Sequence, residues 1–195
     1  MVKRLFDIAC SALGLLLLAP LLLVIAVWIK LDSRGPVLFR QQRVGRRGVP
    51  FMIHKFRTMQ VDNAGLQITV GADSRITGAG RVLRRSKLDE LPQLWDVLRG
   101  AMSFVGPRPE VPRYVALYPA ELRELVLSVR PGITDPSSLA FRDESELLAR
   151  AADPEREYVD VVMPAKLRAA ADYVRQATLA SDLRLMWRTV ATIFH

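Results

Sequence analysis

The chain has 195 residues, enough for one domain with a buried core. Its formal net charge of +8 favours an anionic partner, which can be nucleic acid, an anionic membrane surface or a phosphorylated substrate. A single cysteine excludes an internal disulfide framework and a cysteine-rich zinc site, and two histidines are too few for a histidine metal cluster.

The first predicted element is a long apolar helix. Residues 8–29 contain no charged side chain, and a straight helix of this length would span about 33 Å, the thickness of a bilayer's hydrocarbon core. A buried core helix would need partners on every side, and a secretory signal would need a small-residue cleavage site after the apolar run. The pattern therefore predicts a membrane helix over residues 1–31.

The charges at both ends of this helix bear on its topology. Lys3 and Arg4 precede it, and Lys30 and Arg34 follow it, so the positive-inside rule draws both ends to the cytoplasm. Pro20, near the middle, removes one backbone hydrogen bond. A helix broken there would enter and leave by one face, whereas an ordinary spanning helix can also tolerate a proline. The sequence does not choose between these two topologies.

A small β-hairpin is predicted next. Two short apolar runs, 37–39 and 51–53, flank a basic turn that contains two glycines. Lys55 and Arg57 end the second run, where they form either a solvated basic rim or a grip for phosphate. Residues 61–80 are polar and lack periodicity, so we expect a long loop.

Two adjacent carboxylates, Asp89 and Glu90, lie at the centre of the basic stretch 81–110. Pro92 fits only the first turn of a helix, which predicts a helix start near Asp89, where the helix dipole attracts phosphate. The alternative is that Asp89 caps the helix, alone or in a capping box with Ser86. Acidic helix starts are common, so spacing alone favours the capping interpretation.

The C-terminal half combines rigid turns with amphipathic helices. The turns at 106–109 and 130–132 each present an arginine, Arg108 and Arg130. Helical periodicity follows over 114–129 with a break near Pro119, then over 145–152, 164–179 and 182–194. The last helix carries an apolar stripe that suits either a core or a membrane interface.

Five short motifs, taken in their order and spacing, resemble the bacterial sugar transferases of the monotopic phosphoglycosyl transferase superfamily, in its minimal form. The resemblance covers nearly the whole chain. The motifs are Lys3-Arg4-x-Phe6-Asp7, Lys55-Phe56-Arg57-Thr58-Met59, Leu88-Asp89-Glu90-Leu91-Pro92-Gln93, Gly106-Pro107-Arg108-Pro109-Glu110 and Arg130-Pro131-Gly132-Ile133-Thr134.

The resemblance implies an α+β, mainly helical fold. Residues 1–31 would form a re-entrant N-terminal membrane helix, and residues 32–195 a cytoplasmic catalytic domain with a small β-hairpin and several amphipathic helices at the membrane interface. The expected location is the cytoplasmic face of the bacterial inner membrane. The partners expected beside membrane lipids are a UDP-sugar donor and a polyprenyl (undecaprenyl) phosphate acceptor, with no nucleic acid, and a homo-oligomer is compatible with this form.

The implied reaction transfers a sugar phosphate from the UDP-sugar to polyprenyl phosphate. Asp89 would attack the β-phosphorus and release UMP, and the lipid phosphate would then take the sugar phosphate from the phospho-aspartate. Mg²⁺ is the implied cofactor, with Asp89 as its ligand and Glu90 as the second catalytic residue. A carboxylate attacks a diphosphate poorly unless charge is neutralised, so we assign this work to Mg²⁺ and to basic side chains. The substrate-binding candidates are Lys55, Arg57, Arg84, Arg108 and Arg130.

Three segments depart from the family pattern. Ala19-Pro20 replaces a common Ser-Pro at the helix break, where a serine would support the bend. Ala101 stands where an acidic residue is frequent, and residues 135–139 replace a stretch with glycine and asparagine, so we do not carry the sugar over. Two alternatives remain: a membrane-tethered basic binding module without catalysis, and a single-span structural anchor.

Overall fold

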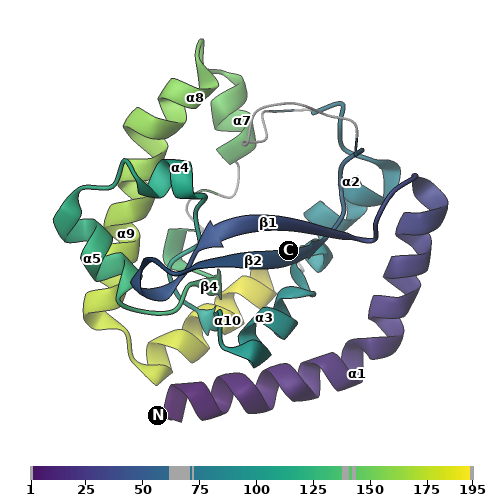
Figure 1. The fold of residues 1–195 in the computed structure, drawn as a ribbon, viewed down its shortest axis with the longest axis horizontal. Helices are drawn as coiled ribbons and strands as arrows, with labels where there is room; N and C mark the ends of the chain where they lie inside the picture. Colours follow the sequence, from purple (N-terminus) through teal and green to yellow (C-terminus); the bar gives the residue numbers. More distant parts are fainter. Residues whose placement is uncertain (1, 62–70, 72, 138–140, 142–143, 194–195) are drawn as a thin grey trace.

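The computed structural model describes residues 2–61, 71, 73–137, 141 and 144–193, and it is an α+β fold that is mainly helical, as predicted (Figure 1). In chain order the elements are α1 (Val2–Asp32), β1 (Leu38–Val44), η1 (Arg46–Gly48), β2 (Pro50–Phe56), α2 (Gly78–Arg85), η2 (Leu88–Glu90), α3 (Gln93–Arg99), β3 (Ser103–Val105), α4 (Pro112–Val115), α5 (Ala120–Leu127), β4 (Gly132–Thr134), α7 (Glu144–Ala149), α8 (Pro154–Glu157), η3 (Tyr158–Val162), α9 (Met163–Gln176) and α10 (Leu179–Ile193).

The long helix α1 is bent and carries an exposed apolar surface. It runs along one side of the molecule and then turns along α2 (Figure 1), and Pro20 lies inside it. A proline in a helix interior is a common cause of such a kink. Among the described residues, α1 is the one helix long and apolar enough to cross a membrane. Its buried residues are few: Asp7, Ser11, Ile25 and Ile29.

Arginine side chains attach both ends of α1 to the rest of the protein. Near its start, Arg4 donates to the carbonyl oxygens of Val97 (2.6 Å) and Leu98 (2.9 Å), in the last turn of α3. At its end, the buried guanidinium of Arg57 donates to the carbonyls of Ser33 (2.8 Å) and Arg34. These bonds satisfy carbonyl groups that helix ends leave without partners. Both ends of α1 are therefore held by one folded unit.

The start of α1 also makes polar contacts with the C-terminal region. Lys3 donates to the carboxylate of Asp182 in α10 and to the carbonyl of Val105 (2.9 Å). Tyr173 donates to the same aspartate at 2.7 Å. Buried Asp7 accepts the backbone N–H of Phe104 at 3.2 Å. The first family motif thus joins α1 to β3, α9 and α10.

The hairpin β1–β2 is confirmed where the apolar runs predicted it. The strands are antiparallel and pair from Leu38 with Phe56 to Val44 with Pro50. Arg47 in the turn has φ 58°. Strand β1 begins one residue after the start of its predicted run and continues to Val44, and β2 extends beyond its predicted run at both ends. One consequence is that Lys55 lies inside β2, directly opposite Phe39.

A second pair of strands, β3 and β4, was not predicted. They are parallel, with Ser103 opposite Gly132 and Val105 opposite Thr134. The two family motifs that contain Gly106 and Gly132 meet here: a Cβ on Gly106 would lie 2.4 Å from the carbonyl oxygen of Arg130, and one on Gly132 would lie 2.1 Å from the nitrogen of Gly106. Only glycine allows two backbones to approach this closely.

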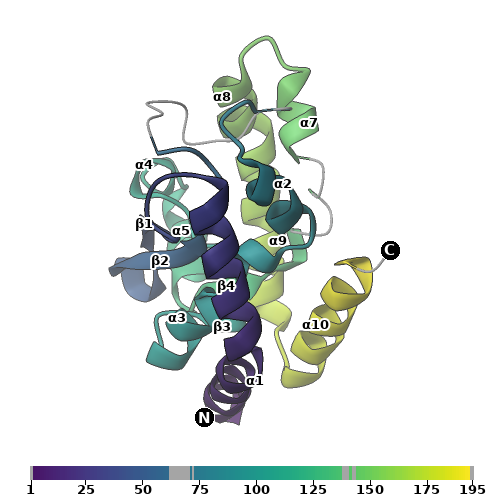
Figure 2. The ribbon, with the colours of Figure 1, turned by 90° about the vertical axis from the view of Figure 1, so that its right-hand side faces the viewer.

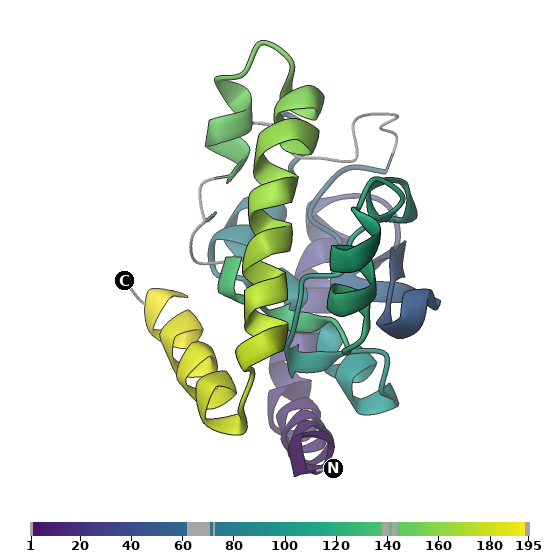
Figure 3. The same ribbon diagram turned by 90° about the vertical axis from the view of Figure 1, so that its left-hand side faces the viewer.

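The C-terminal helices form the second half of the molecule. Helix α9 runs along one face, with α5 on one side and α10 standing apart at the edge (Figures 2 and 3). A cluster of Val111, Tyr114, Leu148, Tyr158 and Met163 forms the core between α4, α7 and α9. The break near Pro119 is confirmed, since α4 ends before it and α5 begins after it. Trp187 on α10 is 74% exposed, so the apolar stripe of this helix does not belong to the core.

Two local predictions were wrong. The loop expected over 61–80 ends early, because α2 begins at Gly78, although residues 62–70 and 72 lie outside the described part. The helix expected to start near Asp89 begins at Gln93, with Pro92 directly before it. On that helix, Leu94 and Val97 are buried and Trp95 is exposed.

Candidate active site

A large cavity of about 1580 Å³ lies between the hairpin, α2 with η2, and the α7–α9 region. Its lining includes Asp89 and Glu90, both at most 9% exposed, and four of the predicted cations: Lys55, Arg57, Arg84 and Arg108. The carboxylate pair is therefore in the wall of a cavity large enough for a nucleotide sugar.

The carboxylates are placed by a tight turn. Helix α2 ends at Arg85, Lys87 takes a left-handed conformation with φ 57°, and η2 then carries Asp89 and Glu90. Leu88 and Leu91, on either side of the pair, pack against a cluster that includes Ile25 and Ile29 of α1. The acidic turn is thus pinned between the cavity and the long apolar helix.

The capping interpretation of Asp89 is not supported by the hydrogen bonds. Ser86 donates its hydroxyl back to the carbonyls of Val82 (2.8 Å) and Leu83 (3.2 Å), so it ends α2 and forms no capping box. No side chain caps η2 or α3. Among the described residues, the Asp89 side chain therefore does not cap a helix.

Glu90 is the anchor of the site. A single oxygen, Oε1, accepts from Lys55 Nζ at 2.6 Å and from Arg108 Nη2 at 2.8 Å. Burial alone would raise the pKa of Glu90, but the charges and hydrogen bonds of Arg108 and Lys55 outweigh it and hold that pKa well below the usual value. Burial also lowers the pKa of Lys55, more than Glu90 restores it. Two cations share one carboxylate, which leaves positive charge for a further anion.

Asp89 has the opposite electrostatics. Burial first, and then the neighbouring charge of Glu90, raise its pKa, although Lys55, Lys87 and Arg84 lower it in part. Its Oδ1 is buried and finds no hydrogen-bond partner among the described residues. A buried carboxylate oxygen without a donor is rare unless it serves a reaction, a metal or a water. This oxygen is therefore a hydrogen-bond acceptor in the cavity wall that lacks a donor among the described residues.

Arg84 reaches the same wall from α2. Its Nε donates to Thr58 Oγ1 at 2.9 Å, and burial lowers its pKa while the nearby charge of Asp89 raises it. Gly80 lets α2 approach so closely, because a Cβ there would lie 2.1 Å from the carbonyl oxygen of Thr58. The Lys55–Met59 motif thus positions Arg84 beside Asp89.

Sequence reasoning missed a partly buried hydrogen-bond network beside Arg108, whose members also line the cavity. Glu110 accepts from Tyr158 Oη at 2.5 Å and from Arg43 Nη1 at 3.3 Å, and Arg43 also donates to the carbonyl of Pro109 at 3.1 Å. Burial and Glu110 raise the pKa of Tyr158. Glu110 was visible in its motif, but Arg43 and Tyr158 had no signal in the sequence, since they come from a strand and a helix far along the chain.

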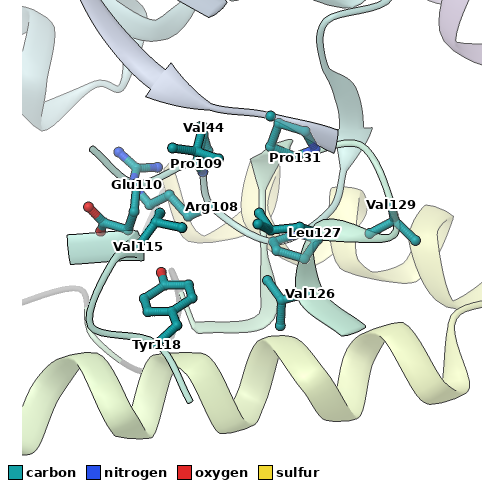
Figure 4. A pocket seen from close by; sticks show the side chains of 12 residues that line it. Val44, Arg108, Pro109, Glu110, Val115, Tyr118, Val126, Leu127, Val129 and Pro131 are labelled. Carbon is teal, nitrogen blue, oxygen red and sulfur yellow. The ribbon is translucent and has the colours of Figure 1, made fainter. Parts of the chain in front are cut away.

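The back of this arginine-bearing segment is tightly packed. Figure 4 shows the side chains of Arg108 and Glu110 extending away from Val126 and Leu127, which pack behind the segment. The space enclosed there is only about 10 Å³, about one water molecule, so it is no substrate site. The segment is therefore a rigid support that presents Arg108 to Glu90.

The structure gives Arg57 and Arg130 other contacts. The guanidinium of Arg57 contributes to the cavity wall but is bound to the carbonyls at the end of α1. Arg130 donates to the carbonyl of Gly100 at 2.8 Å and is not among the described residues that line the cavity. The structure therefore brings Lys55, Arg84 and Arg108 to the carboxylates, and it does not bring Arg130 there.

The side chains that line the cavity limit which metal ion could bind there. Among the described residues, no group of three or more His, Cys, Asp or Glu side chains could hold an ion by itself. Mg²⁺ differs from transition metals in this respect, because it is commonly bound by one or two carboxylates together with substrate phosphates and water. The unpartnered Oδ1 of Asp89 is a donor of the right kind, so the residues fit Mg²⁺ that arrives with a phosphorylated substrate.

Comparison with known proteins places the whole chain in one family. The family model described as bacterial sugar transferase matches residues 1–195. The UDP-glucose:undecaprenyl-phosphate glucose-1-phosphate transferase of Caulobacter vibrioides is 40% identical over 98% of this chain and 69% of its own length. An exopolysaccharide production protein of Rhizobium leguminosarum bv. phaseoli is 39% identical over 97% of this chain and 94% of its length.

Other relatives are much longer than this chain. It spans 39% of the Escherichia coli UDP-glucose:undecaprenyl-phosphate glucose-1-phosphate transferase, at 37% identity. It spans 43% of an Aeromonas hydrophila enzyme, at 35% identity, that is named as an N-acetylgalactosaminephosphotransferase acting on undecaprenyl phosphate. The region shared by all of these proteins includes the cavity described above.

Opposite effects on stability are expected from neutralising the two carboxylates. Glu90→Gln leaves the charges of Lys55 and Arg108 without their anion, which we expect to lower the free energy of unfolding by about 2–3 kcal/mol. This value lies below the roughly 3–5 kcal/mol that breaking a fully buried ion pair costs, because the Arg108 side chain remains 35% exposed and partly hydrated. Asp89→Asn removes a charge that its surroundings disfavour, so stability should stay equal or rise.

Thermal unfolding of the purified protein in detergent measures both effects. Glu90→Gln should lower Tm by about 5–10 °C for a chain of this length, and Asp89→Asn should not lower it. A drop in Tm for Asp89→Asn as large as that for Glu90→Gln would contradict the assigned electrostatics.

Proposed function

Because this chain belongs to the bacterial sugar transferase family, we propose that it transfers a sugar phosphate from a UDP-sugar to polyprenyl phosphate. The observation that carries the proposal is the buried, unpartnered oxygen of Asp89, beside a carboxylate that holds two cations. Three of the relatives named above, from Caulobacter vibrioides, Escherichia coli and Aeromonas hydrophila, are named as transferases that use a UDP-sugar and undecaprenyl phosphate, which supports this pair of substrates. The product, a polyprenyl-diphospho-sugar, would begin the assembly of a glycoconjugate.

Asp89 is the nucleophile in the first step of this proposal. One of its oxygens attacks the β-phosphorus of the UDP-sugar, the bond from that phosphorus to the bridging oxygen breaks, and UMP leaves. The raised pKa of Asp89 reflects poor stabilisation of its negative charge, which makes the ionised form more nucleophilic. Lys55, Lys87 and Arg84 lower that pKa in part and so favour the ionised form that attacks.

The cations around Glu90 hold the phosphate charge. Lys55 and Arg108 are fixed by Glu90 and do not need to reorganise when a diphosphate arrives, which is the arrangement that lowers an electrostatic barrier. Glu90 keeps these side chains in place and is ionised because its pKa is depressed. Its role in this proposal is to position the cations.

The second step returns the enzyme to its starting state. An oxygen of the lipid phosphate attacks the phosphorus of the phospho-aspartate, the bond to Asp89 breaks, and the carboxylate is regenerated. Such a covalent intermediate divides one difficult displacement into two easier ones. It also allows a water-soluble donor and a membrane-bound acceptor to react without being bound together.

Asp89 would also hold Mg²⁺ in this proposal. The Oδ1 atom, which has no hydrogen-bond partner among the described residues, would be the protein's ligand to the ion, with substrate phosphate and water completing the site. When bound, the ion neutralises charge on the diphosphate. Lys55, Arg84 and Arg108 then hold the phosphate oxygens that face the protein.

The apolar surface of α1 supports a re-entrant placement in the cytoplasmic membrane. Twelve large apolar side chains of this helix are at least 38% exposed, from Val2 to Leu31. Both helix ends are bonded to the catalytic unit through Arg4 and Arg57, which favours a helix that enters and leaves by one face. The site would then lie at the level of the lipid phosphates, on the cytoplasmic side.

Asp89→Asn tests the nucleophile directly. We expect it to abolish UMP release from a UDP-sugar in the presence of Mg²⁺ and polyprenyl phosphate, because the amide cannot form the covalent intermediate. Mass spectrometry of the wild type, incubated with donor alone, should find a sugar phosphate on the peptide that contains residue 89. UDP-glucose and UDP-N-acetylgalactosamine are the first donors to test.

The matched control for this experiment is Arg47→Asn, which removes a charge from the exposed hairpin turn. Asparagine tolerates the positive φ of that position, so the fold should be preserved and turnover retained. Normal turnover by Asp89→Asn, or an adduct found only on another residue, would refute the mechanism.

The acid limb of the pH–rate profile should follow the pKa of Asp89. The attack needs the ionised carboxylate, so kcat/KM falls as the pH drops through that pKa. Glu90 raises the pKa of Asp89 and Lys55 lowers it. Glu90→Gln should therefore move the limb to lower pH, and Lys55→Met should move it to higher pH, whatever their effects on the plateau rate. Shifts in the same direction would contradict the assignment.

Accessibility labelling tests the topology of α1. In a Cys10→Ser background, single cysteines at Val2 and Val49, both exposed, are treated with a membrane-impermeant maleimide. A re-entrant helix predicts labelling of both positions in inside-out vesicles and of neither in intact cells. Labelling of Val2→Cys from outside the cell would show a spanning helix.

A further inference from the structure

The cavity beside Asp89 has two chemically different walls. Polar and aromatic side chains of the α4–α9 region form one wall, including Tyr114, Ser137, Glu144, Tyr158 and Lys166. The wall formed by the hairpin and the segment before α2 combines polar and charged side chains, such as Arg40, Gln41 and Thr58, with an apolar group that we call the apolar wall. Its members are Val37, Leu38, Phe39, Phe56, Met59, Val61 and Ile76. A site for one hydrophilic substrate would have little use for the second wall.

The apolar wall begins beside the phosphate-binding cations. Phe39 is paired with Lys55 across the hairpin, and directly opposed residues of a hairpin project from the same face. Lys55 in turn bonds Glu90 at 2.6 Å. Phe39 is 45% exposed and lines the cavity, so an apolar group is available close to the position of a bound phosphate.

The other edge of this wall is continuous with the membrane helix. Val37, Leu38 and Phe56 line the cavity and also pack in the cluster of Ile25 and Ile29 from α1. Helix α2 runs beside this end of α1 (Figures 1 and 2), and Leu83 of α2 is buried in the same cluster. Leu38 and Phe56 project from the face of the hairpin opposite to Phe39 and Lys55, so apolar side chains on both faces of this end of the hairpin connect the lipid-facing helix with the cavity.

Exposed cations flank this path. Arg40 on β1 and Arg81 and Arg85 on α2 line the cavity, and within the described residues no hydrogen bond or ion pair occupies their side chains. A wall of apolar residues with cations at its rim is complementary to a lipid that has a phosphate head. It is not complementary to a nucleoside, which offers a polar base and ribose to the protein.

We propose that the apolar wall, with Phe39 at its inner end, binds the first isoprene units of the polyprenyl phosphate acceptor. This inference rests on the proposed function and adds to it where the lipid lies. The acceptor enters between β1 and α2, from the side of α1, and its phosphate reaches the phospho-aspartate from there. The nucleoside and sugar of the donor are left to the polar wall.

The covalent intermediate allows the two walls to be tested separately. The donor half-reaction is the burst of UMP released from UDP-sugar without acceptor, and the acceptor half-reaction is the decay of the isolated phospho-enzyme with undecaprenyl phosphate. Phe39→Ser should lower kcat/KM for the acceptor by about tenfold, the loss expected when one partly buried aromatic contact disappears. The rate and amplitude of the UMP burst should stay within twofold of the wild type.

The matched control is Val49→Ser, at the far end of the same hairpin. Val49 is 62% exposed and is not part of the cavity lining, so neither half-reaction should change. Phe39→Leu keeps the apolar contact and should restore most of the acceptor rate. Methyl phosphate is a water-soluble acceptor whose chain is too short to contact Phe39, so Phe39→Ser should affect its reaction by less than threefold.

Each other outcome overturns the inference. A reduced UMP burst with a normal acceptor step would assign the apolar wall to the donor, and unchanged half-reactions would show that the lipid lies elsewhere. An equal loss with the long and short acceptors would mean that Phe39 acts on the phosphate and not on the chain. If the wild type gives no UMP burst and no adduct on residue 89, the proposed function itself fails, which is a distinct result.

Discussion

The arrangement of two cations on one oxygen of Glu90 is the interaction on which the site depends. Each of its members comes from a different part of the chain: Lys55 from β2, Glu90 from η2, and Arg108 from the rigid segment after β3. Buried charges persist only when they are paired, so these three elements must meet in one geometry. Asp89 can then remain without a hydrogen-bond donor, since Lys55 and Arg108 both donate to Glu90.

The same constraint explains much of the remaining polar interior. Arg43 and Tyr158 hold Glu110, which fixes the segment that carries Arg108, and Thr58 holds Arg84. These contacts belong to the cavity wall itself and fix the orientation of the neighbouring side chains. A binding module without catalysis would account for the positive charge, but it would give no reason for so much buried support around two carboxylates.

The sequence was most informative where local patterns are strong. Turn chemistry predicted the hairpin, the apolar run predicted α1, and Pro119 predicted the break between α4 and α5. The motif resemblance brought Asp89, Glu90, Lys55, Arg84 and Arg108 to attention, and these five residues do line one cavity. Local patterns therefore located the carboxylates and most of their neighbours.

What the sequence could not predict depends on contacts between distant segments. The parallel pairing of β3 with β4 is only three residues long and has no periodic signal, and Gly106 and Gly132 are explained only by the crossing of two backbones. Arg57 and Arg130 illustrate the same limit, because an arginine in a motif can bind a substrate or a carbonyl group equally well on spacing alone. In this fold their guanidinium groups bond backbone carbonyls of Ser33 and Gly100.

The bond from Arg57 to the end of α1 has a mechanical consequence. Arg57 follows Lys55 by two residues and lies directly after β2. The strand that orients Lys55 toward Glu90 is therefore also connected to the end of the bent helix. A re-entrant helix must adjust its tilt when the bilayer becomes thinner or thicker. In the proposed re-entrant placement, a change of tilt would reach Lys55 through Arg57, so we expect the thickness of the surrounding bilayer to influence the geometry of the site.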